Sequence, residues 1–349
     1  MWALIGTRTT RERKARGQGI TVCAVQPDGS LQARQVLGGM VNPSYLVASR
    51  DGHLVYTVHG DGNAISLLDF DRGTGRIALR RSFDAQLRNP VHLALDRDER
   101  HLLVSSHLTG ELVVIALAAN GSPQSVVQRV ALPGPPGPHR VEQPFSKPHF
   151  NPFDPSGRFV VVPDKGLDRI FVFTFDEGQL APAAEPFVQT REGAGPRGVA
   201  FHPREPWMYA VGELDSTVTA YALDSTSGRL VPRQWLTTLP ESFTGNSRAA
   251  AIAIDPAGRH LYASNRGCDT IEVYAIAATS GLLRHLQSRP SEGRTPRFFT
   301  PHPDGHTLYV LNDDSDTIVQ IAIDPVRGEL GSTRAVLPCA SPVCLVFVG

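Results

Sequence analysis

Residues 295–305 read Thr-Pro-Arg-Phe-Phe-Thr-Pro-His-Pro-Asp-Gly: an entry containing proline, a short apolar stretch and a turn. The same order of features recurs where Asn42-Pro43-Ser44 leads to Asp51-Gly52, and where Gly195-Pro196-Arg197 leads to His202-Pro203. Taking the second residue of each entry as a marker, the markers stand at 43, 90, 148, 196, 249, 296 and 342, which are 46 to 58 residues apart. A repeat of this length that contains several short strands is typical of one blade of a β-propeller.

Each copy continues with segments that suit further strands. Residues 54–56 and 64–68 are apolar, and Thr270-Ile271-Glu272-Val273-Tyr274 alternates as a half-buried strand does. After the seventh marker only residues 343–348 are left for a strand, whereas residues 2–5, 20–25 and 33–37 resemble a second, third and fourth strand. The two ends of the chain should therefore build one blade together, which closes the ring.

We accordingly predict an all-β chain with one domain, residues 1–349. Its fold should be a seven-bladed β-propeller of four-stranded antiparallel blades, one of them shared by the N- and C-terminal strands. The proline-rich residues 133–139 should form an exposed loop over one face, as a partial lid.

Composition limits the partners that we expect. The chain has 34 Lys and Arg against 34 Asp and Glu, which argues against nucleic acid, and it has no apolar run long enough to span a membrane. The four cysteines match neither a zinc site nor a disulfide framework, and the start lacks a signal peptide, so we expect buried thiols and a cytoplasmic location. We interpret the basic run at residues 11–16 as a solvated loop and expect a monomer or a weak homodimer.

Equivalent positions in the repeats separate scaffold from function, because residues that only build a blade should be alike in every copy. The residue after each marker lies where the inner strand starts, and it varies: Ser44, Val91, His149, Arg197, Ala250, Arg297 and Val343. The following position adds His92. A second variable set lies where the second strand ends: Gly60, His107, Lys165, Glu213, Arg266 and Asp313.

Both sets should lie on one face near the axis, since the end of the second strand is beside the start of the first in an antiparallel blade. The combined rim suits a small anionic molecule, because guanidinium groups bind carboxylate or phosphate and a carboxylate or histidine can move protons. The alternative is that these charges are only the solvated ends of strands. Asp168, Asp269 and Asp316 share one position and should accept backbone donors in tight turns.

Several segments resemble the seven-bladed propeller lactonase family, which includes a bacterial type of 6-phosphogluconolactonase and the fungal carboxy-cis,cis-muconate cyclase. The resemblance covers nearly the whole chain, and its most specific segment is Ala263-Ser264-Asn265-Arg266-Gly267. Others are Lys147-Pro148-His149, Gly195-Pro196-Arg197-Gly198 and Val211-Gly212-Glu213-Leu214. The resemblance implies that His149, Arg197, Glu213 and Arg266 form the active-site set, and the comparison of repeats selects the same four.

From these residues we expect hydrolysis of a small anionic lactone such as 6-phosphogluconolactone. Arg197 and Arg266 would bind the anionic group and polarise the carbonyl, and Glu213 or His149 would be the general base. The remaining substrate-binding candidates are His92, Lys165, Arg297 and Asp313. Guanidinium groups can stabilise the electrophile, so we expect no metal and no cofactor. Two alternatives remain: lactone-forming cycloisomerisation of a carboxymuconate, and a propeller that binds a partner without catalysis.

Overall fold

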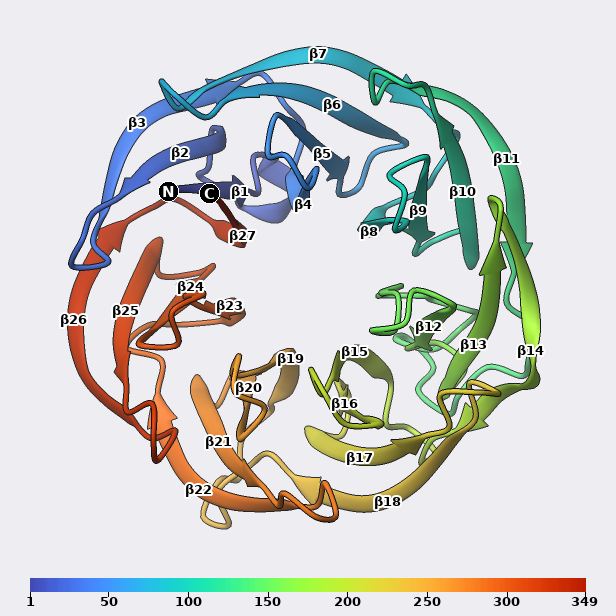
Figure 1. The fold of residues 1–349 in the computed structure, drawn as a ribbon. Coiled ribbons are helices and arrows are strands. Elements are labelled where there is room, and N and C mark those ends of the chain that lie inside the picture. The colour runs from blue at the N-terminus through green and yellow to red at the C-terminus, as the bar shows by residue number, and fades with distance from the viewer.

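The computed structural model describes residues 1–349 and contains seven antiparallel sheets arranged in a ring (Figure 1). They surround a central channel whose mouth is lined by residues of every blade. The predicted seven-bladed propeller is therefore confirmed. Blade 1 comprises β4 (Pro43–Ala48), β5 (Leu54–His59), β6 (Ala64–Asp71) and β7 (Arg76–Asp84). Blade 2 comprises β8 (Pro90–Leu95), β9 (His101–Ser106), β10 (Glu111–Leu117) and β11 (Pro123–Ala131). Blade 4 comprises β15 (Pro196–Phe201), β16 (Trp207–Gly212), β17 (Thr217–Leu223) and β18 (Leu230–Thr237). Blades 5 and 6 comprise β19 (Arg248–Ile254), β20 (His260–Arg266), β21 (Thr270–Ile276) and β22 (Leu283–Pro290), and β23 (Pro296–Pro301), β24 (Thr307–Asn312), β25 (Thr317–Ile323) and β26 (Leu330–Pro338).

Blade 7 joins the two ends of the chain, as the sequence predicts. Its strands are β27 (Pro342–Val348), β1 (Trp2–Thr7), β2 (Gly19–Val25) and β3 (Leu31–Gly38), in that order from the channel outward. The C-terminal strand pairs antiparallel with the N-terminal one, for example Ile5 with Leu345. The ring is thus closed by backbone hydrogen bonds between residues more than 300 positions apart.

Blade 3 departs from the four-stranded pattern. Its sheet has only three strands, β12 (Phe159–Asp164), β13 (Arg169–Asp176) and β14 (Gln179–Gln189), and its inner segment makes two isolated bridges, Pro148 with Asp164 and Phe153 with Val160. Prolines at 148, 152 and 155 explain the difference, because each removes a backbone donor that a ladder would need. The inner wall of the channel is therefore irregular beside this blade.

The hydrophobic core is divided among the spaces between blades. Seven clusters of buried side chains each join two neighbouring blades; one of them packs Tyr56 and Val58 of blade 1 against Val104 and Val113 of blade 2. Tyrosine hydroxyls also donate across four of these spaces to a glycine carbonyl of the next blade, as from Tyr209 to Gly281 at 2.7 Å. Since burial between blades holds the ring together, the channel itself is free to be lined by polar groups.

Six of the inner strands, including β27, share a local irregularity at their start. Their pairing register shifts within the first residues, as between Pro196 and Gly198 or between Pro296 and Phe298. An extra residue of this kind is a β-bulge, which re-aims side chains. In consequence two successive residues, such as Arg197 with Gly198, line the channel together.

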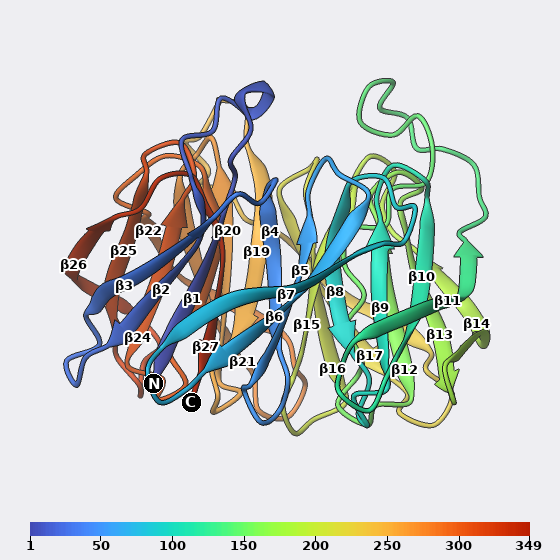
Figure 2. The same ribbon diagram turned by 90° about the horizontal axis from the view of Figure 1, so that it is seen from above.

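Two segments rise above one face of the ring, whereas the two chain ends lie at the opposite face (Figure 2). The first joins β1 to β2 and contains the short 3-10 helix η1 (Arg11–Arg13); the second joins β11 to β12 and contains the predicted loop. The helix η1 has three residues, and the structure holds no helix with the length and hydropathy of a membrane span. The raised segments flank the mouth of the channel.

Candidate active site

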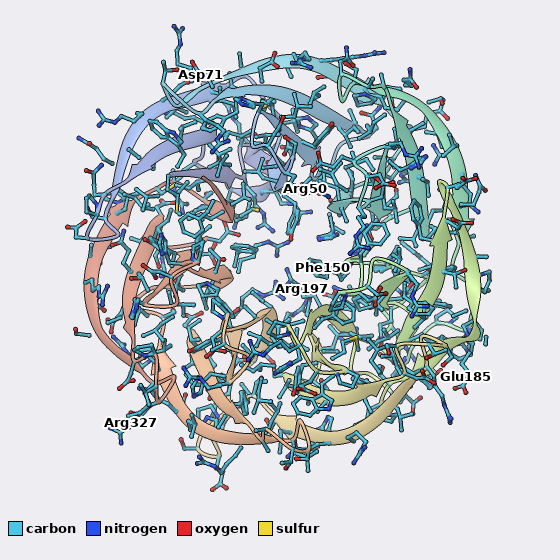
Figure 3. The ribbon with its side chains drawn as sticks, in the orientation of Figure 1. Arg50, Asp71, Phe150, Glu185, Arg197 and Arg327 are labelled. Atoms are coloured by element: carbon cyan, nitrogen blue, oxygen red, sulfur yellow. The ribbon has the colours of Figure 1, made fainter.

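The mouth of the channel opens into a cavity of about 570 Å³. Every blade contributes to it the residue after its marker, as the comparison of repeats predicts: Ser44, Val91, His149, Arg197, Ala250, Arg297 and Val343. The ends of the second strands add five further lining residues, namely Gly60, His107, Glu213, Arg266 and Asp313. Figure 3 shows Arg197 and Phe150 projecting toward the channel from neighbouring blades. The structure thus brings the four predicted active-site residues to one cavity.

Carboxylates hold the starts of the inner strands in place. Asp168 accepts hydrogen bonds from the backbone of Gly193 and Gly195, at 2.7 Å each, just before Arg197. Asp269 accepts one from Thr295 at 2.8 Å, two residues before Arg297. The structural role predicted for these aspartates is confirmed, and they adopt the left-handed backbone conformation that Asp tolerates. They fix where the arginines enter the cavity.

Glu213 is the centre of an ion-pair cluster. Its side chain is 5% exposed, and its oxygens lie 3.0 Å from Nζ of Lys165, 3.0 Å from Nε of Arg197 and 3.2 Å from Nη2 of Arg266. Burial alone would raise the pKa of Glu213, but the three cations outweigh it and hold the pKa well below its ordinary value. A carboxylate held in this way is a weak base, and it aligns the cations around it.

Unlike Glu213, His149 has no ion-pair partner. Its ring packs edge-to-face on His107 at 5.4 Å and makes no hydrogen bond within the protein. Burial, with the nearby positive charge of Arg197, lowers the pKa of His149 well below its ordinary value. The imidazole is therefore neutral near pH 7, and its nitrogens are free to bind a ligand or accept a proton.

Arg297 lines the cavity without any ion pair or hydrogen bond within the protein. Burial, together with repulsion from Arg8, Arg197 and Arg266, lowers the pKa of Arg297 well below its ordinary value. An unpaired guanidinium in such a place is costly, and an anionic ligand would offset that cost. It is the most direct sign of an anion-binding site in the molecule.

Two of the predicted substrate-binding residues do not line the cavity. His92 is buried between the rings of Tyr45 and Phe150, 4.4 and 3.8 Å from their centroids, and it contacts Asn151 at 2.9 Å. Burial lowers the pKa of His92 to about 3, so it is a neutral packing residue and we withdraw it as a ligand contact. Lys165 lies behind the cavity wall as the partner of Glu213.

Sequence reasoning missed several residues of the cavity. Arg8 directly follows β1, the second strand of blade 7, and its Nη1 lies 2.8 Å from Oδ2 of Asp313. Extending the comparison of repeats to the N-terminal strand would have found it, because it is equivalent to Glu213 in blade 4. Burial raises the pKa of Asp313, and Arg8 counters that rise.

The raised segments supply other missed residues. The basic run at residues 11–16 is largely exposed, as predicted, but Arg13 is also ion-paired to Asp61 of blade 1 and lines the cavity. Glu142, from the loop before blade 3, also lines the cavity together with Arg248. The comparison of repeats does not predict these positions. Arg13 and Glu142 lie in segments that other blades lack, and Arg248 lies before the marker at 249.

The cations of the cavity can hold an anion, and a neutral histidine beside them can accept a proton. The structure contains no cluster of three or more His, Cys, Asp or Glu side chains that could hold a metal ion. The arrangement is thus suited to attack by water on a carbonyl group of an anionic molecule.

Comparison with known proteins gives a consistent result. The family model described as "Lactonase, 7-bladed beta-propeller" matches residues 2–347. The chain is 30% identical over 328 residues to a 6-phosphogluconolactonase of Cronobacter sakazakii, covering 93% of this chain and 92% of the relative. It is 29% identical over 310 residues to a 6-phosphogluconolactonase of Bacillus subtilis, covering 88% and 87%. Among solved structures, a periplasmic gluconolactonase of Pseudomonas aeruginosa superposes with a TM-score of 0.93 and 30% identity, covering 100% of this chain and 99% of that one.

Proposed function

Because this chain belongs to the seven-bladed β-propeller lactonase family, we propose that it hydrolyses a sugar lactone with an anionic group, such as 6-phosphogluconolactone, in the cavity at the channel mouth. The relatives named 6-phosphogluconolactonase support the phosphorylated substrate. The single observation that carries the proposal is Arg297, a cation that faces the cavity with no partner. A phosphate group supplies the partner that it lacks.

We place the phosphate beside Arg297 and the lactone carbonyl toward Arg197 and His149. Arg297 belongs to blade 6 and His149 to blade 3, so the sugar would extend across the cavity between them. Arg197 and Arg266 lie between these two blades and are oriented by Glu213. Their remaining N–H groups would stabilise the negative charge that develops on the carbonyl oxygen.

His149 is the better general base of the two candidates. Glu213 binds three cations and has a lowered pKa, whereas His149 is neutral and unpaired. In the proposed step His149 takes a proton from water as the water oxygen attacks the carbonyl carbon. The bond from that carbon to the ring oxygen then breaks, and the proton passes to the ring oxygen. The products are a hydroxyl group and a carboxylic acid, which ionises.

Purified protein with 6-phosphogluconolactone tests the activity, measured as hydrolysis above the uncatalysed rate. Arg297→Met should raise KM for this lactone by about 10- to 100-fold and have a smaller effect with glucono-δ-lactone, which has no phosphate. The matched control is Arg327→Met, an exposed arginine at the outer edge of the ring (Figure 3). No hydrolysis of either lactone would contradict the proposal. Loss of the conjugated-diene absorbance of a carboxymuconate would instead favour the lactone-forming alternative.

The cytoplasmic location and the monomeric or weakly dimeric state stay predictions. One of the solved relatives is described as periplasmic. Cell fractionation and sedimentation of the purified chain are the measurements that test them.

A further inference from the structure

The loop before blade 3 is a fixed wall of the cavity. Gln143 is 1% exposed; its amide nitrogen donates to the carbonyl of Lys165 at 2.9 Å and to Oδ1 of Asp168 at 2.8 Å. Farther along, Asp164 accepts hydrogen bonds from Ser146 and from the backbone of Lys147. Before Glu142, the backbone N–H of Gly137 donates to the carbonyl of Gly166 at 2.8 Å. The loop is therefore held against blade 3 on both sides of Glu142, and the fold sets the position of this residue.

Glu142 places its carboxylate between two cations, Lys165 behind the cavity wall and Arg248 in its lining. One oxygen lies 2.8 Å from Nζ of Lys165, and the other lies 2.7 Å from Nη1 of Arg248. Lys165 and Arg248 lie in turn 3.0 and 3.7 Å from Oε1 of Glu213. The carboxylate of Glu142 therefore occupies the place between two cations where an anionic group of a ligand would otherwise bind.

The remaining cations of the mouth are paired in the same way, Arg8 with Asp313 and Arg13 with Asp61. Arg297 alone among the lining cations has no carboxylate partner. The cavity thus has one unpaired site for an anion, on the blade 6 side. On the blade 3 side it presents a carboxylate of its own.

This asymmetry matters for a lactonase, because hydrolysis changes the number of anionic groups on the ligand. A phosphorylated sugar lactone carries one anionic group, the phosphate. Its product carries two, since ring opening converts the ester carbonyl into a carboxylate. In the proposed orientation the new carboxylate forms beside His149, which is in the blade that Glu142 covers.

We propose that Glu142 is a specificity-determining residue that disfavours the two-anion product relative to the one-anion substrate. The inference rests on the proposed function for the orientation of the ligand. Repulsion between the carboxylate of Glu142 and the new carboxylate weakens product binding and speeds product release. By the same effect, Glu142 limits the cavity to ligands with a single anionic group on the blade 6 side.

Calorimetric titration with two unreactive ligands tests the proposal without relying on activity. The ligands are 6-phosphogluconate, which has a phosphate and a carboxylate, and glucitol 6-phosphate, which has only the phosphate. In Glu142→Gln the Kd for 6-phosphogluconate should fall about five- to tenfold relative to the Kd for glucitol 6-phosphate, as expected for removal of a close, partly exposed like charge. The matched control is Glu185→Gln, an exposed residue on the outer strand of blade 3.

A second variant keeps the test decisive if Glu142→Gln does not fold. Arg248→Gln leaves Glu142 with one cation fewer, so it should move the ratio of the two Kd values in the opposite direction. A ratio that stays within about twofold of wild type in the folded variants overturns the role of Glu142 alone. Failure of wild-type protein to bind either sugar phosphate overturns the proposed function and this inference together.

Discussion

Replacing Arg297 with methionine tests whether the cavity is built around an unpaired charge. Arg297 has no ion pair to lose, and its guanidinium is repelled by Arg8, Arg197 and Arg266. Methionine removes that repulsion and the cost of burying the charge. Because the side chain faces the cavity and keeps some contact with water, we expect the free energy of unfolding to rise by only about 1 kcal/mol.

Arg197→Met is the contrasting variant. Its Nε lies 3.0 Å from Oε2 of Glu213, which corresponds to a Coulomb energy of about 5.5 kcal/mol at an effective dielectric constant of about 20. Part of this is offset by desolvation, and Glu213 keeps Lys165 and Arg266 as partners. We expect Arg197→Met to lower the free energy of unfolding by about 2–3 kcal/mol.

Urea unfolding of the wild type and the two variants measures both changes. The same experiment with inorganic phosphate at about ten times its Kd should add about 1.4 kcal/mol to the wild type and nothing to Arg297→Met. Opposite signs for the two variants support the reasoning. A loss of more than about 1 kcal/mol in Arg297→Met would refute it, because it would mean that the guanidinium is stabilised by the protein itself.

Three further predictions concern catalysis and the scaffold. His149→Gln should lower kcat by about 10²–10⁴-fold while changing the Kd of 6-phosphogluconate much less. If the binding of 6-phosphogluconate weakened by the same factor as kcat, this would contradict the role of His149 as the base. In the wild type, kcat/KM should fall with decreasing pH only well below 6.5, because the lowered pKa of His149 keeps the imidazole neutral above that range; an acid limb at or above 6.5 argues against it. Tyr209→Phe removes the hydrogen bond to Gly281 and should lower the free energy of unfolding by about 1 kcal/mol. Gly281→Ala should lower it by about 2 kcal/mol or more, because φ of Gly281 is +69° and the added Cβ would lie 2.4 Å from Trp207. Thermal unfolding measures both changes.

The propeller could be predicted from the sequence because its signal is repeated. One entry such as Gly195-Pro196-Arg197 is weak evidence, whereas seven at similar spacing specify blade number and ring closure. Proline at the first position of an inner strand is compatible with the sheet, because this strand lies at the edge facing the channel. The irregular inner edge of blade 3 was not predicted, although its closely spaced prolines carry the reason.

The site could be predicted only where it follows the repeat. Arg197 and Arg297 were found because the equivalent residues in the other five blades are uncharged. A residue that differs from its equivalents in this way is not needed to build the blade. Glu142 has no equivalent in other blades, so no comparison within the chain could reveal it. His92 was misplaced because the rings of Tyr45 and Phe150 pack against it and Asn151 contacts it, and a pattern of equivalent positions does not show which side chain its neighbours cover.

The pairing of β27 with β1 has a consequence for synthesis of the protein. The partner of the N-terminal strand is Pro342–Val348, which the ribosome makes after all the other strands. Until then blade 7 lacks its innermost strand, and the edge of β1 is open to pairing with another chain. A premature stop within the codons for residues 342–348 should therefore cause aggregation out of proportion to the number of strand residues lost, and a free peptide with the sequence of residues 342–348 should rescue the shortened chain.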